Sequence, residues 1–354
     1  MAQKETVFVG LSGGVDSSVA ALRLLREGYN VVGVFIKVWH PDFLVCNWEE
    51  ERLDAMRVAA KLGIPFLTCD AQKAYKDDVA DYFIREYEAG RTPNPDVMCN
   101  KYVKFGAFLE FAREHGAAYI ATGHYAQVGR DVDGFPLMRG ADANKDQSYF
   151  LWTLTKEQLS RTLFPVGDSL KDEIRREAAR AGLPTAGKRD SQGICFLGHV
   201  DIPEFLSHYM TLEGGDVLSP SGAVIGRHHG ALVYTSGQRH GFTITDPQEA
   251  KKPHYILARD ISKNTITVSE ERPQERSGDS ITLSDVNAIA WTPTIGEEVQ
   301  LQTRYRQHPA TGRITGVGNA TLTITFATAG EQASAGQSCV LYRKERCLGG
   351  GIIA

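Results

Sequence analysis

One stretch near the start of the chain, residues 10–18 with the sequence GLSGGVDSS, constrains the fold more than any other. It follows a short apolar run, Val7 to Val9, that has strand character. After it, apolar side chains recur at helical spacing as far as Gly28. Glycines let a backbone approach an anion closely, and the first N–H groups of a helix point toward it. The pattern therefore predicts a phosphate-binding loop between a strand and a helix.

The loop differs from two familiar phosphate-binding motifs. A Walker A motif needs a Lys after its glycines, and none follows here; the GxGxxG spacing is also missing. The loop resembles instead the PP-loop of ATP pyrophosphatases, which implies ATP cleavage between the α- and β-phosphates and adenylation of a substrate oxygen. The hydroxyls of Ser12, Ser17 and Ser18 would then hold pyrophosphate, and Asp16 would cap the helix or help to hold Mg²⁺. The alternative is a glycine-rich turn without a ligand.

Length and composition set broad limits. With 354 residues the chain is too long for one typical domain, and its 42% hydrophobic residues can form packed cores. A net charge of −4 gives no global attraction for nucleic acid, although a local basic face stays possible. We expect no membrane contact, because no run of about 18 apolar residues occurs. The start leads directly into a strand without a signal peptide, so we expect a cytoplasmic protein.

The six cysteines include no CxxC pair, so we expect neither a zinc ribbon nor an Fe–S site of the CxxC type. We identify no dedicated metal site elsewhere in the sequence. Two of them lie in loops with distinctive neighbours. Cys195 follows Lys188 and Arg189, and nearby positive charge lowers the pKa of a thiol. Cys99 is the last residue but one of a segment with two prolines, residues 90–100, which we expect to be stiff and not helical. For each thiol, a packed core position stays open as the alternative.

Residues 1 to about 125 alternate between strand and helix patterns. Strands are expected at 31–38, 65–68 and 119–121, and helices at 49–62, 77–87 and 105–115. This alternation predicts a parallel sheet covered on both faces, with ligands at the carboxyl ends of its strands. After the last of these strands, Gly123 would allow a nucleotide to approach, while His124 would touch phosphate or a base, or be structural.

Beyond about residue 205 the alternation stops. From about residue 277, short runs of alternating polar and apolar residues predict a small antiparallel barrel. The adjacent His228 and His229 have no third ligand at convincing spacing, so we expect polar contacts rather than a metal.

Nine segments together resemble the bacterial tRNA-specific 2-thiouridylases in order and spacing: GLSGGVDSS, GRTPNPDVMCN, ATGHYA, NKDQSYFLWTL, LFPVG, DSQGICF, SGQRHGF, TRYRQ and CLGGGII. The resemblance implies an adenine nucleotide α-hydrolase-like α/β catalytic domain at residues 1–205. It implies a small central tRNA-binding domain at 206–276 and a C-terminal antiparallel β-barrel at 277–354. The segment 39–48 around Cys46 is less similar than its flanks.

The same resemblance implies an enzyme that uses ATP, with Mg²⁺, to replace the C2 oxygen of a tRNA wobble uridine with sulfur. The sulfur would come from a persulfide donor, a cysteine desulfurase or a sulfur-relay protein. Cys195 would carry the persulfide, Cys99 would be the second active thiol, and Asp96 beside it would serve as general base. The implied ATP-binding residues are Gly10, Leu11, Ser12, Gly13, Gly14, Val15, Asp16, Ser17, Ile36 and Gly123. Those at the target base are Asn94, Pro95 and Asp96, and those that contact tRNA are His124, Lys145, Asp146, Gln147, Arg304, Tyr305 and Gln337.

Two other classes of protein remain open from the sequence. A PP-loop ligase that joins a carboxylate to an amine, such as argininosuccinate synthetase, would need no paired loop cysteines. An RNA-binding protein with a degenerate nucleotide site is disfavoured by the intact SGGVDS loop. Pyrophosphate release with and without tRNA distinguishes the latter from an enzyme.

Overall fold

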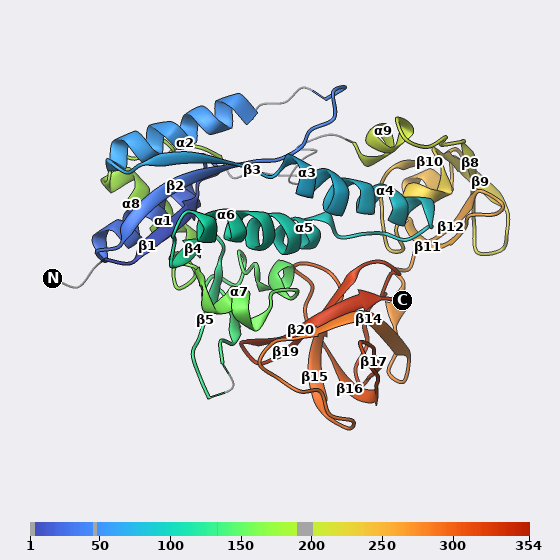
Figure 1. Cartoon of the computed structure of the whole chain (residues 1–354). Coiled ribbons are helices and arrows are strands. Elements are labelled where there is room, and N and C mark those ends of the chain that lie inside the picture. Colours follow the sequence, from blue (N-terminus) through green and yellow to red (C-terminus); the bar gives the residue numbers. More distant parts are fainter. Residues whose placement is uncertain (1–3, 45–47, 133, 190–200) are drawn as a thin grey trace.

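The computed structural model describes residues 4–44, 48–132, 134–189 and 201–354 (Figure 1). The N-terminal part is built on a five-stranded sheet in the order β3-β2-β1-β4-β7, and every pairing in it is parallel. This confirms the parallel sheet expected from the alternation of strand and helix patterns. The strands are β1 (Thr6–Gly10), β2 (Asn30–Lys37), β3 (Phe66–Asp70), β4 (Tyr119–Ala121) and β7 (Thr162–Leu163). The pattern did not indicate β7, which is only two residues long.

Helices cover both faces of this sheet, because its strands are apolar on both sides. Val7 and Val9 pack with one set of helices, whereas Phe8 between them packs with the other. The first set contains α1 (Val15–Arg26), α2 (Trp48–Leu62) and α8 (Lys171–Arg180). The second contains α3 (Gln72–Tyr75), the π-helical turns η1 (Lys76–Ala80) and η2 (Cys99–Ala107), α4 (Asp81–Glu88), α5 (Pro95–Met98) and α6 (Phe108–Glu114).

Part of the proline-containing segment is helical, which contradicts the expectation for residues 90–100. Pro95 is the first residue of α5, and the helical backbone continues without a break through Cys99 into η2. Proline fits the first position of a helix because the N–H that it lacks would have no intrahelical partner there. Asn94 caps the helix by accepting a hydrogen bond from the Val97 N–H (3.4 Å). The prolines therefore stiffen residues 90–94 and start a helix after them.

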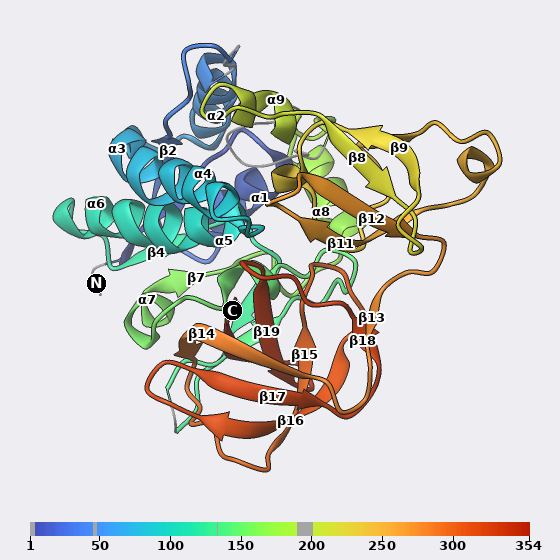
Figure 2. The ribbon, with the colours of Figure 1, turned by 90° about the vertical axis from the view of Figure 1, so that its right-hand side faces the viewer.

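The middle of the chain forms a second five-stranded sheet in the order β10-β9-β8-β12-β11 (Figure 2). Its one parallel pairing joins β8 to β12, and its other pairings are antiparallel. His228 is buried in it and bonds to the backbone of Asn264 and Gly230, so this histidine is structural, as expected. The strands are β8 (Gly215–Leu218), β9 (Val224–His228), β10 (Phe242–Ile244), β11 (Tyr255–Asp260) and β12 (Thr265–Ser269), and α9 (Ile202–Ser207) precedes them.

The C-terminal part is a closed antiparallel barrel in the strand order β14-β17-β16-β15-β19-β20, and a pairing of β14 with β20 completes the circle. This confirms the predicted barrel. Its core contains mainly Ile, Leu and Val side chains that alternate along the strands. The strands are β14 (Ser280–Ala288), β15 (Glu298–Gln302), β16 (Ala310–Val317), β17 (Leu322–Phe326), β19 (Ser338–Arg343) and β20 (Arg346–Ile353), and a small pair, β13 (Gln274–Glu275) with β18 (Gly330–Glu331), lies beside them.

Two strands from the N-terminal part extend the sheet of the barrel. β6 (Leu137–Arg139) pairs with β20, and β5 (Ala126–Val128) pairs with β6. The Arg139 N–H also donates to the Glu345 carbonyl (2.8 Å). The barrel is therefore joined to the N-terminal part by backbone hydrogen bonds, which the sequence patterns did not indicate.

Two further short helices, η3 (Ser148–Leu151) and α7 (Lys156–Ser160), lead from this shared sheet back to β7. None of the helices in the described residues has both the length and the apolar character needed to cross a membrane.

Candidate nucleotide and thiol sites

The glycine-rich loop runs from the end of β1 at Gly10 to the start of α1 at Val15, as the sequence predicted. Gly13 has a positive φ of 71°, and a Cβ there would lie 2.7 Å from the Glu51 carbonyl oxygen in α2. Gly14 is the N-cap, and no side chain caps the helix. Asp16 therefore does not cap α1, which leaves the N–H groups of the first turn directed toward the loop.

The three serines of the loop have different surroundings. Ser12 is exposed, and its hydroxyl lies 3.3 Å from that of Ser17, which in turn donates to the Gly14 carbonyl (3.2 Å). Ser18 is fully buried, donates to the same carbonyl (2.7 Å) and accepts from Thr185 (2.9 Å). The hydroxyl of Ser18 is thus used inside the protein, so its position gives no support to the prediction that it holds pyrophosphate.

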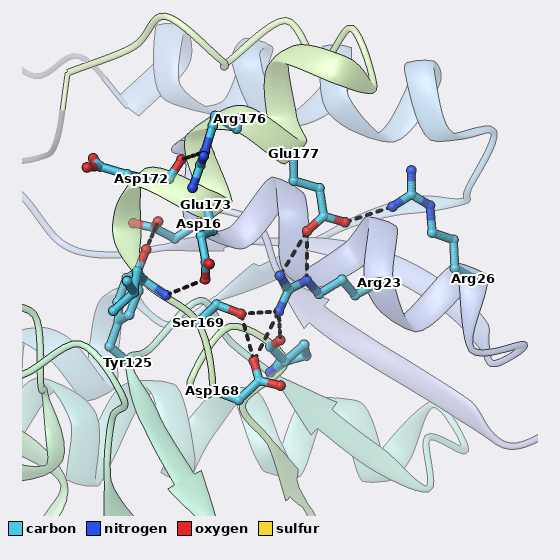
Figure 3. A network of polar contacts seen from close by, with 12 residues as sticks. Asp16, Arg23, Arg26, Tyr125, Asp168, Ser169, Asp172, Glu173, Arg176 and Glu177 are labelled. Carbon is cyan, nitrogen blue, oxygen red and sulfur yellow. Dashed lines mark hydrogen bonds and ion pairs between the residues drawn. The ribbon is translucent and has the colours of Figure 1, made fainter.

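Asp16 is held by two residues that are distant in sequence. Its carboxylate accepts a hydrogen bond from the Tyr125 hydroxyl (2.8 Å), and Figure 3 shows these two side chains next to each other. Both carboxylate oxygens also lie 2.7 Å from the Lys171 ammonium nitrogen. Sequence reasoning missed Lys171, because no local pattern links the first residue of α8 to a loop that lies about 150 positions earlier.

Gly123 and Ile36, both assigned to ATP by resemblance, do lie next to the loop. A Cβ on Gly123 would be 2.6 Å from the Ser17 nitrogen, so this glycine lets the turn after β4 touch the start of α1. The Cδ1 of Ile36 lies 3.5 Å from the position of a Cβ on Gly10. The close approach at Gly123 is thus between two protein backbones. The carboxyl ends of β1, β2 and β4 come together here.

His124 is buried, with 8% of its surface exposed, and its ring lies near the rings of Phe105 (5.8 Å) and Phe164 (6.0 Å). It shares a hydrogen bond of 2.7 Å with the Thr122 hydroxyl. Burial lowers the pKa of His124 well below its usual value, so the ring is neutral at pH 7. A tRNA contact by His124 stays a prediction, and this position gives it no support.

Cys99 is almost fully buried, with 1% of its surface exposed, at the junction of α5 and η2. Asp96 lies in the first turn of α5 and is partly exposed, three residues before the thiol. The adjacent Asn100 donates to the Phe150 carbonyl (3.0 Å). Asn94, Asp96 and Cys99 therefore occupy one short helix, whereas the sequence had indicated a loop.

Residues 90–94, here called the Pro-rich segment, are held by contacts from both other parts of the chain. Arg259 of β11 donates to the Gly90 carbonyl (2.8 Å). From the barrel side, the Gln337 amide donates to the carbonyls of Thr92 (2.9 Å) and Pro93 (3.2 Å). Gln337 was expected to contact tRNA; its side-chain nitrogen instead bonds to this segment.

The other predicted tRNA contacts fall into two groups. Asp146 is buried and pairs with Arg139 (2.7 Å), and Gln147 accepts from the Tyr125 N–H (2.9 Å), so both stabilise the fold. Lys145, directly before them, is half-buried. Arg304 donates to the Ser236 carbonyl of the central part, and the ring of Tyr305 lies 4.5 Å from that of Phe150. No single surface collects all seven of these residues.

The remaining described thiols are packing residues, as expected. Burial raises the pKa of Cys69 to about 11, and that of Cys339 and Cys347 to about 12. Such thiols carry almost no thiolate at neutral pH. Cys195 and Cys46 lie outside the described residues, so the predicted meeting of Cys99 with Cys195 stays a prediction. No group of three or more His, Cys, Asp or Glu side chains suited to a metal occurs in the described ranges.

The parallel sheet, the glycine loop at its edge and the attached barrel define the class of this protein as a multidomain protein with a HUP-type nucleotide domain. Family models match in the same order: "tRNA methyl transferase HUP domain" at residues 5–199, "tRNA methyl transferase PRC-barrel domain" at 203–270 and "Aminomethyltransferase beta-barrel domain" at 278–353.

Similar proteins define the family more narrowly. The chain is 45% identical to the tRNA-specific 2-thiouridylase MnmA of Streptococcus thermophilus, over 99% of this chain and 95% of that protein. It is 44% identical to the tRNA-specific 2-thiouridylase MnmA 2 of Geobacillus kaustophilus, over 98% and 94% of the two chains. The chain therefore belongs to the tRNA-specific 2-thiouridylase family. A solved 4-thiouridine synthetase–RNA complex with bound ATP shares 22% identity over 54% of this chain and 44% of that one, with a TM-score of 0.35, too low for any conclusion about function.

Proposed function

We propose that this protein is a tRNA sulfurtransferase that replaces the C2 oxygen of a wobble uridine with sulfur and releases AMP and pyrophosphate. The observation that carries the proposal is nearly full-length identity of 44–45% with proteins named tRNA-specific 2-thiouridylase. The intact glycine loop and the helical Asn94–Cys99 element supply groups that this chemistry requires.

The first step is adenylation. The carbonyl carbon at C2 of uridine is a poor electrophile, because its oxygen is a poor leaving group. Attack of this oxygen on the α-phosphorus of ATP forms an O–P bond, breaks the bond to the β-phosphate and releases pyrophosphate. The N–H groups at the start of α1 and the exposed Ser12 hydroxyl are available to stabilise the departing pyrophosphate, and the Ser17 hydroxyl joins them by exchanging its bond to the Gly14 carbonyl.

The second step transfers sulfur. The outer sulfur of a persulfide on Cys195 attacks C2, and AMP leaves as the C2–O bond breaks. The Cys99 thiolate then attacks the Cys195 sulfur, so that the bond between the two sulfurs of the adduct breaks and 2-thiouridine is released. This leaves a Cys99–Cys195 disulfide, which an external dithiol reduces with two electrons. Asp96, which lies one helical turn before Cys99, takes up the thiol proton.

Because Cys99 is buried, these reaction steps require the structure around the thiol to open first. A thiol that is 1% exposed meets neither a bulky substrate nor a donor until the structure around it opens. We propose that the tRNA, docked against the barrel and the central sheet, provides that opening through the Pro-rich segment. Arg304, Tyr305 and Lys145 are predicted contacts that are only partly buried, and they take part in this docking.

The proposal also includes the metal ion that accompanies ATP, the sulfur donor, the cellular compartment and the division into domains. ATP brings Mg²⁺ with its phosphates, since the described residues hold no cluster of ligands for the ion alone. A persulfide-carrying protein supplies the sulfur, and the reaction takes place in the cytoplasm, where tRNA is modified. We keep residues 1–205, 206–276 and 277–354 as the proposed division into domains.

Mass spectrometry of wobble nucleosides tests the function directly. Unmodified tRNA is incubated with the protein, ATP and a persulfide source, and 2-thiouridine is expected only when all three are present. Cys99→Ser and Cys195→Ser should each abolish the product while ATP still binds. Full activity of either variant would remove that cysteine from the mechanism.

A matched control uses a cysteine that the mechanism does not need. Cys339→Ala changes a buried barrel thiol, and its product yield should stay close to that of the wild type once the folded fraction is taken into account. Pyrophosphate release without any thiolated nucleoside would instead favour a PP-loop ligase. Binding of tRNA without ATP turnover would favour an RNA-binding protein.

A further inference from the structure

The glycine loop contains no cation of its own, yet the structure places one beside it. Residues 10–18 include neither Lys nor Arg, whereas a polyphosphate brings several negative charges. Lys171 lies in the first turn of α8, and its ammonium nitrogen is 2.7 Å from both carboxylate oxygens of Asp16. Asp16 is in the first turn of α1, directly before Ser17. The ammonium group of Lys171 therefore directly contacts a side chain of the phosphate loop.

The position of Lys171 is fixed from several sides. Its backbone N–H donates to Asp142 (3.0 Å), and its ammonium lies 5.7 Å from the centre of the Tyr125 ring. The side chain is 9% exposed, so it does not extend into solvent as most lysines do. The Tyr125 hydroxyl bonds to the same carboxylate. Burying an ion pair costs free energy, because both charged groups lose water. A purely structural role therefore explains this buried lysine poorly.

A second ion pair between the same two helices gives a useful contrast (Figure 3). Arg23 of α1 bonds to Glu177 of α8 (2.8 Å), and further to Asp168, to Ser169 and to the Pro165 carbonyl. This pair lies two turns away from the loop and fastens α1 to α8. The two short contacts of Lys171, in contrast, go to a single carboxylate at the phosphate end of α1.

We propose that Lys171 is a ligand of the nucleotide phosphates and supplies the positive charge that the loop lacks. When ATP binds, the ammonium group exchanges one Asp16 oxygen for a phosphate oxygen. This exchange requires only a change in the conformation of the Lys171 side chain. The inference rests on the proposed use of ATP, and it adds a residue to that site. Without nucleotide, the pair with Asp16 keeps the lysine in place and compensates a carboxylate that would otherwise repel the polyanion.

Calorimetric titration of the full-length protein with pyrophosphate, and separately with ATP, tests the assignment. Lys171→Met should weaken pyrophosphate binding about 10- to 100-fold, because a charge-assisted hydrogen bond is lost. Lys171→Arg, which keeps the charge, should recover part of the affinity. Arg23→Met is the matched control: it breaks the other ion pair between α1 and α8 and should leave the affinity within about twofold of wild type. Urea unfolding of each variant separates loss of fold from loss of binding.

The double variant D16N/K171M distinguishes a direct contact between Lys171 and phosphate from mere neutralisation of the Asp16 carboxylate by Lys171. If Lys171 binds phosphate, the double variant stays weak even though the carboxylate charge is gone. Recovery of wild-type affinity in the double variant would overturn the assignment, as would normal affinity of K171M alone. Failure of the wild type to bind either ligand would instead remove the proposed function itself, which keeps the two failures distinct.

Discussion

The phosphate loop and the Pro-rich segment owe their conformations to different parts of the chain. The loop is shaped by its own glycines, with Gly13 at a positive φ and Gly14 as the helix N-cap. The Pro-rich segment is held by Arg259 and Gln337, which come from the central sheet and from the barrel. The difference teaches that nucleotide binding is built within the N-terminal part alone, whereas the position of the Cys99 thiol depends on all three parts of the molecule.

If this comparison is correct, substitutions beside the loop should change nucleotide binding, and substitutions in the barrel should change the reactivity of Cys99. The four predictions below test the contrast.

The largest effect is expected from Gly123→Ala. The added Cβ would lie 2.6 Å from the Ser17 nitrogen and 2.8 Å from the Asp16 carbonyl carbon, and backbone atoms cannot move aside easily. We expect a loss of about 3 kcal/mol in the free energy of unfolding, and ATP binding too weak to measure by calorimetry. Gly187→Ala is the control, because no atom of the described residues lies within 4 Å of the new atom. Wild-type ATP affinity in Gly123→Ala would show that the turn does not shape the loop.

Gln337→Leu should affect the Pro-rich segment and Cys99 rather than the phosphate loop. It leaves the carbonyls of Thr92 and Pro93 without this donor, which costs about 1–3 kcal/mol. Alkylation of Cys99, followed by peptide mass spectrometry, should become faster, while pyrophosphate affinity stays unchanged. The same change at the exposed Gln300 of β15 serves as the control. If alkylation rates of the two variants match, the barrel does not control the thiol.

Asn94→Ala should have a smaller effect. It removes the cap of α5, and such losses cost about 1 kcal/mol. Hydrogen exchange of the Val97 amide should accelerate, and the free energy of unfolding from urea titration should fall slightly. Asn94→Asp, which can still cap, should behave like the wild type. A slow Val97 amide in the Ala variant would mean that the distant contacts alone hold the helix.

The smallest effect concerns pH, through His124 beside the loop. Its folded-state pKa lies below the unfolded value near 6.5, so the unfolded chain binds the proton more readily. Stability is therefore retained above pH 6.5 and falls as pH drops, by about 0.8 kcal/mol between pH 7.5 and 6.0. His124→Asn should show a flatter stability profile over this range. Equal slopes for wild type and variant would contradict the burial of a neutral ring.

Local patterns predicted much of the fold. The apolar run before the loop became β1, the helical spacing after it became α1, and alternating residues after 277 became the closed barrel. Pro95 shows where such reasoning ends: proline suits a stiff loop and the first position of a helix equally well. Only the Asn94 cap and the contacts that lock the preceding segment decide between them.

The site was predictable to the extent that it is local. Residues 10–17, Ile36 and Gly123 do gather at one edge of the sheet, as spacing and resemblance indicated. Lys171 was missed because its contact with Asp16 spans 155 positions, and the bond from the Gln337 amide to the Pro-rich segment was missed as well, while its tRNA contact stays a prediction. Such pairings depend on how the domains pack, for which the sequence contains no local signal. The site assignments that depend on Cys195 stay predictions.

The shared sheet of β5, β6 and the barrel has a consequence for dissecting the molecule. β20 pairs with β6 through Arg346 and Met138, so a cut before residue 277 would remove β20 from one side of β6 and leave only β5 on the other. The shortened protein would then present a bare strand edge, which invites pairing between copies. Any attempt to study the nucleotide domain in isolation should therefore remove or cap this hairpin as well, or it will yield aggregates instead of an enzyme fragment.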